Sequence, residues 1–433
     1  MRSLILATGL ALASTHATAT PLFQPPGPNL TFGDMSNPQN VVAYAANPAT
    51  AASRGTTFGG GFGFGILSSV GMSAEIGDVP DLEQRVQDVS DKLDQVTNDF
   101  TVAGELKQDI DDLVATLGGQ PYLLNVGAAV QVPLTPLYVM GNGWGAVTVD
   151  ANVSVQTRLS VLDGPTEVVL VDGGFQPKTD SALYLKAATV AEISLAYSRS
   201  LFDLGGLGHL YGGVRGNYYG VGLAKTLAGV AVADQFDQLV QDELNKDRAL
   251  QTGFGVDLGL LLVGDNHRLG ATFKNLNQPS FKYDPIGTDC DQLSGASQDS
   301  CYIAQLHADR IDLQETWVMD PQVKLEAALF TDDRAWLVGV TADANPVHDP
   351  LGNEIQMVGV SAGYATRSWL LPGFRLGYHQ NLVGTQLGYA SLGLTLFKSV
   401  NLDVAYGIDT MRYNADTEVP RKLALNLGVE LTF

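Results

Sequence analysis

The chain has 433 residues, of which 48 are glycine, 45% are hydrophobic and only 16% are charged. Its formal net charge of −21 argues against nucleic acid as a partner, because binding to phosphates requires an excess of lysine and arginine. Abundant glycine, few charges and no change in composition after residue 60 indicate one large sheet protein.

The N-terminus has the features of a secretory signal peptide. Arg2 precedes a short apolar run from Leu4 to Ala13, and Ala17 and Ala19 are small residues suited to a cleavage site. The apolar run is shorter than the roughly 18 residues that a membrane helix needs. We therefore expect residues 1–19 to be removed and the mature chain to be exported.

Residues 20–57 are predicted to form a hatch, or plug, inside the structure formed by the strands that follow. Prolines are frequent here and cannot donate to a strand ladder, so a regular strand is excluded. The run VVAYAANPATAA is too apolar to favour water. We expect Asn47 to bond lumen-facing groups, and the small residues of this run to pack against glycines of the first strand. The candidate gate residues are Asn47, Pro48, Ala49, Gly61, Gly63 and Gly65.

Segments of alternating apolar and small or polar residues recur from residue 58 onward. In the last of them, LALNLGVELTF, every odd position from Leu423 to Phe433 is apolar, so one face of the strand is apolar and the other polar. The polar faces carry Gly, Ser, Asn, Thr and a few Asp in place of the Lys, Glu and Arg of a water-facing sheet. This pattern predicts an all-β membrane protein, a 14-stranded antiparallel transmembrane β-barrel over residues 58–433. The predicted strands are 58–76, 121–132, 144–160, 184–201, 208–222, 251–264, 267–276, 318–330, 334–345, 355–366, 372–382, 386–397, 399–411 and 421–433.

The connections between these strands alternate between short and long. Short turns on the periplasmic side and long loops outside are typical of outer-membrane barrels, and an even strand number places both termini in the periplasm. In the loop 77–120, apolar stripes over 82–100 and 106–117 predict two helices separated by a break at 101–104. The loop 223–250 is predicted to contain a third helix at 231–249.

Two cysteines, Cys290 and Cys301, lie in the long loop 277–317. In an exported protein they are expected to form a disulfide, and closing so short a loop contributes about 3 kcal/mol.

Several residues are singled out by their position on the predicted strands. We expect Phe433, an aromatic residue on the lipid face of the closing strand, to be the signal that the outer-membrane assembly machinery reads. The other expected partners are outer-membrane lipid and lipopolysaccharide. The candidate lumen-facing residues are Asp150, Asn152, Arg158, Asp257, Ser361, Asn401 and Asp403.

The trio Asn47-Pro48-Ala49 before the first strand resembles the Asn-Pro-Ala element of FadL-type outer-membrane barrels. That resemblance implies fourteen strands and a lumenal hatch. The long first loop, the stretch FKNLNQP (Phe273–Pro279) and the terminal Phe433 look more like the outer-membrane family named conjugal transfer protein TraF. The resemblance covers essentially the whole mature chain.

Motifs for catalysis or for metal binding are weak. Ser361 in GVSAG matches a nucleophile elbow, but an elbow needs a strand-to-helix turn and Ser361 is predicted in mid-strand. The histidines have no metal-ligand spacing. We expect no enzyme, no metal and no cofactor.

Two functions of different classes remain. The first is a porin-like gated passage for hydrophobic or amphipathic small molecules, with the hatch as its plug. The alternative is a non-transporting envelope component, associated with conjugation or with surface assembly, that acts through its loops. A barrel hydrolase would depend on Ser361 alone.

Overall fold

The computed structural model describes residues 27–37, 39–58, 61–81, 99–141, 143–171, 173–230, 250–366, 368–414 and 417–433. The predicted signal peptide, nearly all of the predicted helix 82–100 and the predicted helix 231–249 lie outside these residues.

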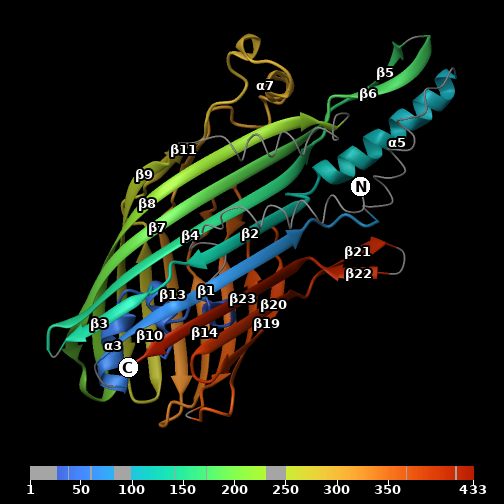
Figure 1. The fold of residues 1–433 in the computed structure, drawn as a ribbon. Helices are drawn as coiled ribbons and strands as arrows, with labels where there is room; N and C mark the ends of the chain where they lie inside the picture. Colours follow the sequence, from blue (N-terminus) through green and yellow to red (C-terminus); the bar gives the residue numbers. More distant parts are fainter. Residues whose placement is uncertain are drawn as a thin grey trace.

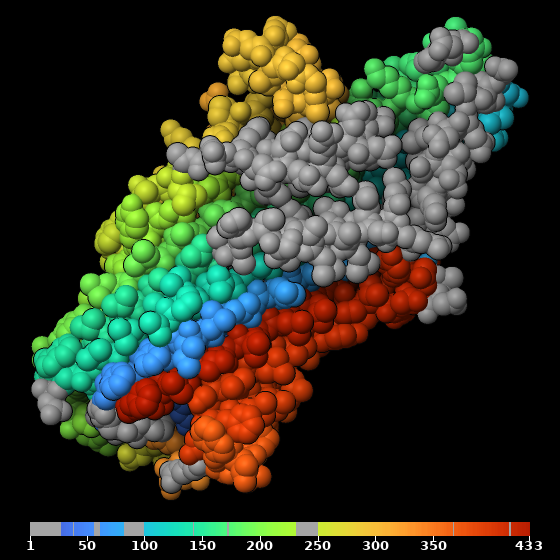
Figure 2. Space-filling view, viewed as in Figure 1, coloured from blue at the N-terminus to red at the C-terminus, as the bar shows by residue number. Residues whose placement is uncertain are grey.

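The strands of the wall form one closed antiparallel sheet (Figure 1). Each strand pairs with the next along the chain, and the first strand pairs with the last, as the neighbouring blue and red surfaces of Figure 2 show. Two short strands, β2 and β3, share one position between β1 and β4, so the wall is fourteen strands round. The predicted 14-stranded barrel is confirmed.

The wall strands are β1 (Phe62–Ile76), β2 (Leu124–Gln131), β3 (Leu137–Gly141), β4 (Gly145–Leu162), β7 (Ala182–Asp203), β8 (His209–Gly229), β9 (Gln251–Val263), β10 (His267–Lys274), β13 (Gln322–Phe330), β14 (Trp336–Asp343), β17 (Met357–Tyr364), β18 (Gly373–Asn381), β19 (Gly388–Leu396), β20 (Val400–Gly407) and β23 (Lys422–Thr432).

Four predicted boundaries were wrong by four residues or more. The strand predicted at 318–330 starts at Gln322, because Thr316–Val318 belongs to a separate strand. The first strand starts at Phe62 and not at residue 58, because Thr50–Phe58 forms a helix (α3). The strand predicted to end at residue 222 continues to Gly229, since its outer part packs under a loop. The strand predicted at 399–411 ends at Gly407, and the chain then forms a separate hairpin, β21 (Thr410–Asn414) with β22 (Thr417–Pro420).

The second strand of the wall is interrupted between β2 and β3, which the sequence analysis missed. Pro133 and Pro136 lie in the interruption and have no N–H to donate. Backbone bonds to both neighbouring strands persist, because the Val132 N–H donates to the Ala151 carbonyl (2.8 Å) and the Gly65 N–H donates to the Pro136 carbonyl (3.1 Å). The wall therefore stays hydrogen-bonded across the interruption.

The two faces of the strands differ as a membrane barrel requires. In β23, Leu425 and Leu427 are 40% and 51% exposed, whereas Asn426 between them is 2% exposed. Large apolar side chains thus point outward and polar ones inward, the reverse of a water-soluble protein. At the end of the barrel that carries the C-terminus, the rings of Phe62 and Phe433 stack with centroids 5.0 Å apart. Among the described residues, no helix is long and apolar enough to cross a membrane.

Helix α5 (Phe100–Gly118) lies at the opposite end of the barrel, against the projecting hairpin of β5 (Thr166–Val171) and β6 (Gly174–Thr179) (Figure 1). The predicted break at 101–104 was wrong. Those residues form the first turn of α5, because the Asp99 side chain accepts a hydrogen bond from the Thr101 N–H and caps the helix. The apolar stripe predicted at 106–117 is buried.

The long loop after β10 contains the disulfide and helix α7 (Ala296–Leu306). The remaining short elements are β11 (Ser280–Lys282), β12 (Thr316–Val318), β15 (Val347–His348), β16 (Glu354–Ile355) and the 3-10 turns η3 (Gly205–Leu207) and η5 (Cys290–Gln292).

The N-terminal segment, residues 27–37 and 39–58, lies inside the barrel and is called the hatch below. It contains α2 (Asn29–Phe32), the 3-10 turn η2 (Val41–Ala45) and α3. Both polar and apolar hatch residues are buried, among them Asn29 and Tyr44. Helix α2 ends at Gly33, whose φ of 71° and whose contact with the His379 ring both require glycine.

Candidate functional site

A buried ion pair ties the hatch to the wall. The Arg215 guanidinium on β8 donates to Asp257 on β9 through Nε (2.9 Å) and Nη2 (2.8 Å). Its Nη1 donates to the backbone carbonyl of Ala45 (2.7 Å). Arg215 and Asp257 are 6% and 2% exposed, so the pair is shielded from solvent on every side. One side chain thus joins two strands and the hatch.

The Asn47-Pro48-Ala49 trio forms a second anchor. The Asn47 Nδ2 donates to the carbonyls of Leu260 (3.2 Å) and Ala271 (3.4 Å) in β9 and β10, and its Oδ1 accepts from the Ala49 N–H (2.9 Å). Asn47 is 1% exposed. Asn47 thus contacts the backbone of two adjacent wall strands.

Two wall glycines make room for this trio. A Cβ atom at Gly213 would lie 2.4 Å from the Pro48 carbonyl carbon, and one at Gly259 would lie 2.1 Å from the Asn47 Oδ1. The sequence analysis expected the hatch to pack against Gly61, Gly63 and Gly65 of β1, and the hatch turn η2 does lie beside β1. Those three glycines accommodate other wall groups, because the nearest atoms to a Cβ there belong to Phe433, Tyr138 and Ser68.

Three wall carboxylates also receive hatch donors. Glu430 accepts from the Val41 N–H (2.7 Å), Glu326 accepts from the Ser36 N–H (2.7 Å), and Asp403 accepts from the Thr31 hydroxyl (2.5 Å). The wall therefore supplies acceptors to backbone and hydroxyl groups along the hatch, and the hatch is held by polar contacts in addition to its buried apolar residues.

Of the seven residues expected to face the lumen, six are buried, and Arg158 lines the cavity described below. Asp257 accepts from Arg215, and Asp403 accepts from Thr31 of the hatch, as described above. Asn401 donates to Glu430 (3.1 Å). Asp150 accepts from Gln131, Arg158 donates to the Leu351 and Pro121 carbonyls, and Asn152 lies opposite Glu192. Sequence reasoning missed Arg215, Glu326 and Glu430. A signal was available, since a charged residue on the polar face of a membrane strand is costly to bury and needs a partner.

Ser361 is buried in mid-strand on β17, and its Oγ has no hydrogen-bond partner among the described residues. It therefore has no bonded base of the kind a nucleophile requires. Among the described residues, no group of three His, Cys, Asp or Glu could hold a metal ion.

A cavity of about 260 Å³ lies above the hatch, toward the long-loop end of the barrel. Hatch residues Leu30 and Asp34 form part of its lining, and loop residues Tyr122, Asp349 and Ile355 line it as well. The lining is of mixed character. Apolar members include Ala129, Leu325, Ala342, Met357 and Leu387, and charged members include Glu75, Arg158, Lys324, Asp343 and Lys422.

Most of the charges around this cavity are paired. Lys422 lies 2.7 Å from Glu75, and Lys324 lies 3.1 Å from Asp34 of the hatch. Burial raises the pKa of the loop residue Asp349 to about 6, although hydrogen bonds from Asn353 oppose the shift. The cavity is thus a polar chamber with apolar patches.

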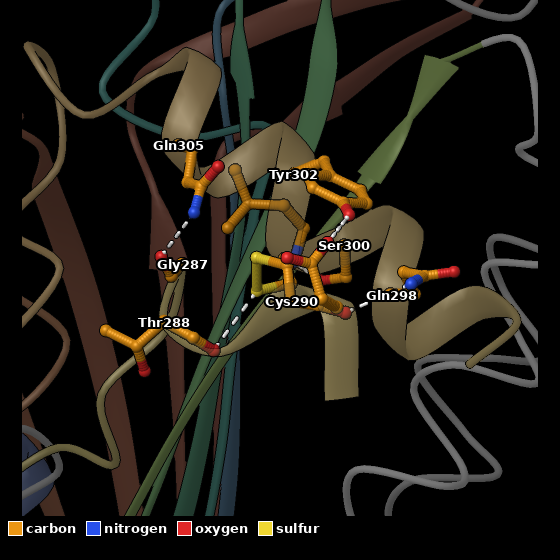
Figure 3. Close-up of a disulfide and its surroundings, with 10 residues drawn as sticks. Gly287, Thr288, Cys290, Gln298, Ser300, Tyr302 and Gln305 are labelled. Carbon is orange, nitrogen blue, oxygen red and sulfur yellow. Dashed lines mark hydrogen bonds between the residues drawn. A yellow bond between two sulfur atoms is a disulfide. The ribbon is translucent and has the colours of Figure 1, made fainter. Parts of the chain in front are cut away.

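The predicted disulfide between Cys290 and Cys301 is present and organises the long loop above the barrel (Figure 3). The Gln298 Nε2 donates to the Cys290 carbonyl (3.1 Å), and the Gln305 Nε2 donates to the Gly287 carbonyl (2.8 Å). Farther along this loop, Glu315 receives Lys186 of β7 (2.6 Å), which fastens the loop to the wall.

A closed fourteen-strand barrel with an apolar exterior and a polar, plugged interior defines a membrane-spanning protein of the outer-membrane type. More particularly, the chain belongs to the family described as "F plasmid transfer operon, TraF, protein", which matches residues 44–343. The predicted relation to TraF is confirmed.

Among solved structures, the chain is similar to a TodX deltaS2S3 mutant, a monoaromatic hydrocarbon channel, with 13% identity over 90% of this chain and 93% of that chain and a TM-score of 0.44. It is also similar to the CymD monoaromatic hydrocarbon channel, with 11% identity over 95% and 98% of the two chains and a TM-score of 0.41. The phospholipase A of the Escherichia coli outer membrane shows 8% identity over 89% and 98%, with a TM-score of 0.28. The sequence matches no curated protein.

Proposed function

We propose that the protein is a gated passage for hydrophobic or amphipathic small molecules, and that amphipathic molecules suit its interior best. The observation that carries this proposal is the 260 Å³ cavity between hatch and loops, whose lining mixes apolar side chains with charged ones. Its size is near the lower end for small-molecule sites and is too small for a folded partner. Charged groups can hold a polar head while Ala129, Met357 and Leu387 contact a short tail.

The hatch is the proposed gate. It blocks the interior below the cavity, yet none of its described residues joins the sheet of the wall. Its polar attachments are separate hydrogen bonds and ion pairs, which can break one group at a time. We place the short turns and both termini in the periplasm, so that the hatch would move toward that side.

Transport of matched ions tests this proposal. Hexyltrimethylammonium and hexanesulfonate combine a permanent charge with a short apolar tail. Tetramethylammonium and methanesulfonate have the same charged head groups but lack the hexyl tail. In proteoliposomes containing the full mature chain, we expect faster uptake of at least one hexyl ion than of its tailless counterpart. Equal uptake within both pairs would contradict selectivity for amphipathic molecules.

A cavity-filling variant provides the structural arm of the same experiment. Ala129 is 9% exposed and lies opposite the buried Ser154, so Ala129→Phe places a ring inside the barrel. Its neighbour Ala128 lies opposite Met72, which is 52% exposed, so Ala128→Phe points toward lipid and is the matched control. We expect Ala129→Phe, and not Ala128→Phe, to reduce hexyl-ion uptake to the level of empty vesicles.

A second candidate function is an envelope component that acts through its loops. Helix α5 and the β5–β6 hairpin project beyond the barrel (Figure 1), and Leu170 on this hairpin is 69% exposed. Such a role would be favoured if removal of the hairpin abolished the biological activity of the protein while leaving uptake unchanged.

A further inference from the structure

The connection between β14 and β17, residues 344–356, crosses the long-loop end of the barrel and is called the strap below. Its tip reaches β4, where the Arg158 Nη1 donates to the Leu351 carbonyl (3.0 Å). In the order of the wall strands, β4 is six positions from β14 in one direction and seven from β17 in the other. The strap therefore joins opposite sides of the closed wall.

The tip of the strap is seated in an apolar socket on the far side. Leu351 is fully buried there. Side chains of β7, β8 and the disulfide loop form the socket, namely Ala188, Val190, Tyr219, Val221, Leu223, Phe281, Tyr283, Trp317 and Met319. Because burial removes the apolar Leu351 side chain from water, it favours the seated position.

Side chains of the disulfide loop also bond the backbone of the strap. The Trp317 Nε1 donates to the His348 carbonyl (3.1 Å), and the Tyr283 hydroxyl donates to the Pro350 carbonyl. The two short strands of the strap, β15 and β16, pair with each other in a sheet separate from the wall. The tip is thus held by side-chain contacts, which can separate without breaking the wall.

The tip is a preformed turn. The Asp349 carboxylate accepts from the N–H groups of Leu351 (2.8 Å) and Asn353 (2.7 Å), and from the Asn353 Nδ2 (2.6 Å). Gly352 in this turn has a φ of 83°, which favours glycine. These hydrogen bonds lie within the strap, so they can persist when the tip leaves the socket. The tip can therefore move as one body.

The underside of the strap lines the larger cavity. The strap residues in the lining are Asp349, Gly352, Asn353, Glu354 and Ile355. Hatch residues line the same cavity from the other end, as described above. The cavity thus lies between the strap and the hatch.

We propose that the strap is a lid over this cavity: its tip leaves the socket to admit an amphipathic molecule and returns to close over it. The inference rests on the proposed function and adds the element that controls access to its site. A single span of chain covers only part of the mouth of a fourteen-strand barrel, since the diameter of a barrel grows with the number of its strands. The strap therefore restricts entry to the cavity beneath it and leaves a path for small ions.

Labelling of a cysteine in the socket measures the movement of the lid without measuring transport. Ala188 is 1% exposed and belongs to the socket, so Ala188→Cys places a thiol beneath the tip. The full mature chain, folded in detergent with its disulfide intact, is treated with a sulfonated maleimide. We expect slow labelling of Ala188→Cys. Adding Leu351→Ala should accelerate it at least tenfold (about 1.4 kcal/mol), because the shortened side chain no longer fills the socket.

Two further variants separate release of the tip from general loosening. Tyr283→Phe keeps the ring in the socket but removes the hydroxyl bonded to the strap, and it should accelerate labelling about fivefold. Leu306→Ala makes the same change as Leu351→Ala at a side chain of α7 that is 55% exposed, and it should leave the rate unchanged. Tyr283→Phe decides the matter if Leu351→Ala does not fold.

Labelling in the presence of a ligand tests closure of the lid over an occupant. We expect at least one of the two hexyl ions, hexyltrimethylammonium or hexanesulfonate, to slow labelling of Ala188→Cys. Its tailless counterpart at equal concentration should leave the rate unchanged. No effect of either hexyl ion, with the effects of the variants intact, would contradict the proposed function, because the lid would then move without an amphipathic molecule beneath it.

Two results would overturn the lid itself. One is labelling of Ala188→Cys as fast as that of Glu105→Cys, at an exposed position of α5, which would show that the tip is not seated. The other is an unchanged labelling rate in both Leu351→Ala and Tyr283→Phe, which would show that these contacts do not hold the strap.

Discussion

Arg215→Met is expected to destabilise the protein by about 3–5 kcal/mol, the usual cost of leaving one member of a buried ion pair without its partner. The substitution removes both donors to Asp257 and the donor to the Ala45 carbonyl, so the wall and the hatch each lose their hydrogen bonds to this side chain. The measured quantity is the urea concentration at the midpoint of unfolding, for protein folded in detergent. Unfolding is monitored on gels by the difference in mobility between heated and unheated samples.

The double variant Arg215→Met/Asp257→Leu is the control for this result. Removing both charges should destabilise the protein by less than the sum of the losses in the two single variants, because the double variant leaves no lone buried charge. Additive losses would mean that Arg215 and Asp257 act independently, and the anchor described above would not exist.

Gly213→Ala is expected to dislodge the hatch without removing any polar group. The new Cβ would lie 2.4 Å from the Pro48 carbonyl carbon, a backbone atom that cannot turn aside as a flexible side chain could. Overpacking of this kind costs about 1–3 kcal/mol, which the structure can relieve by moving the hatch. A cysteine at position 51, where Ala51 is 1% exposed, would report the movement through faster labelling in a background lacking Cys290 and Cys301.

Gly220→Ala, on the same strand, is the matched control. Its Cβ would meet Leu250 at 3.4 Å, an ordinary contact with a side chain outside the hatch. Labelling at position 51 should remain slow in this variant. Equal labelling rates in the two alanine variants would show that Gly213 does not position the hatch.

The strand pattern was readable from the sequence because the requirement is local: each strand must present apolar residues to lipid and small or polar residues to the interior. Alternation around Leu425 and Leu427 needs no knowledge of the strand's neighbours. The interruption at Val132–Pro136 was not predicted, because prolines at the end of an alternating run look like the start of a turn. The short strand β3 beyond it has only five residues.

The contacts of the hatch were less predictable, because they join residues far apart in the chain. Asn47 could be assigned to the interior, but nothing local specifies that it reaches Leu260 and Ala271. Glycines close in sequence to the hatch were chosen as its packing partners, whereas Gly213 and Gly259 fill that role. Register around a closed barrel decides which glycines face the hatch, and register is a property of all the strands together.

Single-channel recording on the mature protein, with and without residues 20–57, tests the gate most directly. We predict that the intact protein is closed or opens only briefly, because the hatch fills the interior with buried residues and is bonded to both Asp257-bound Arg215 and Glu430. The shortened protein, once shown to fold as a barrel, should carry a larger and persistent current. Equal conductance and equal open times in the two proteins would contradict the hatch as the gate of this passage.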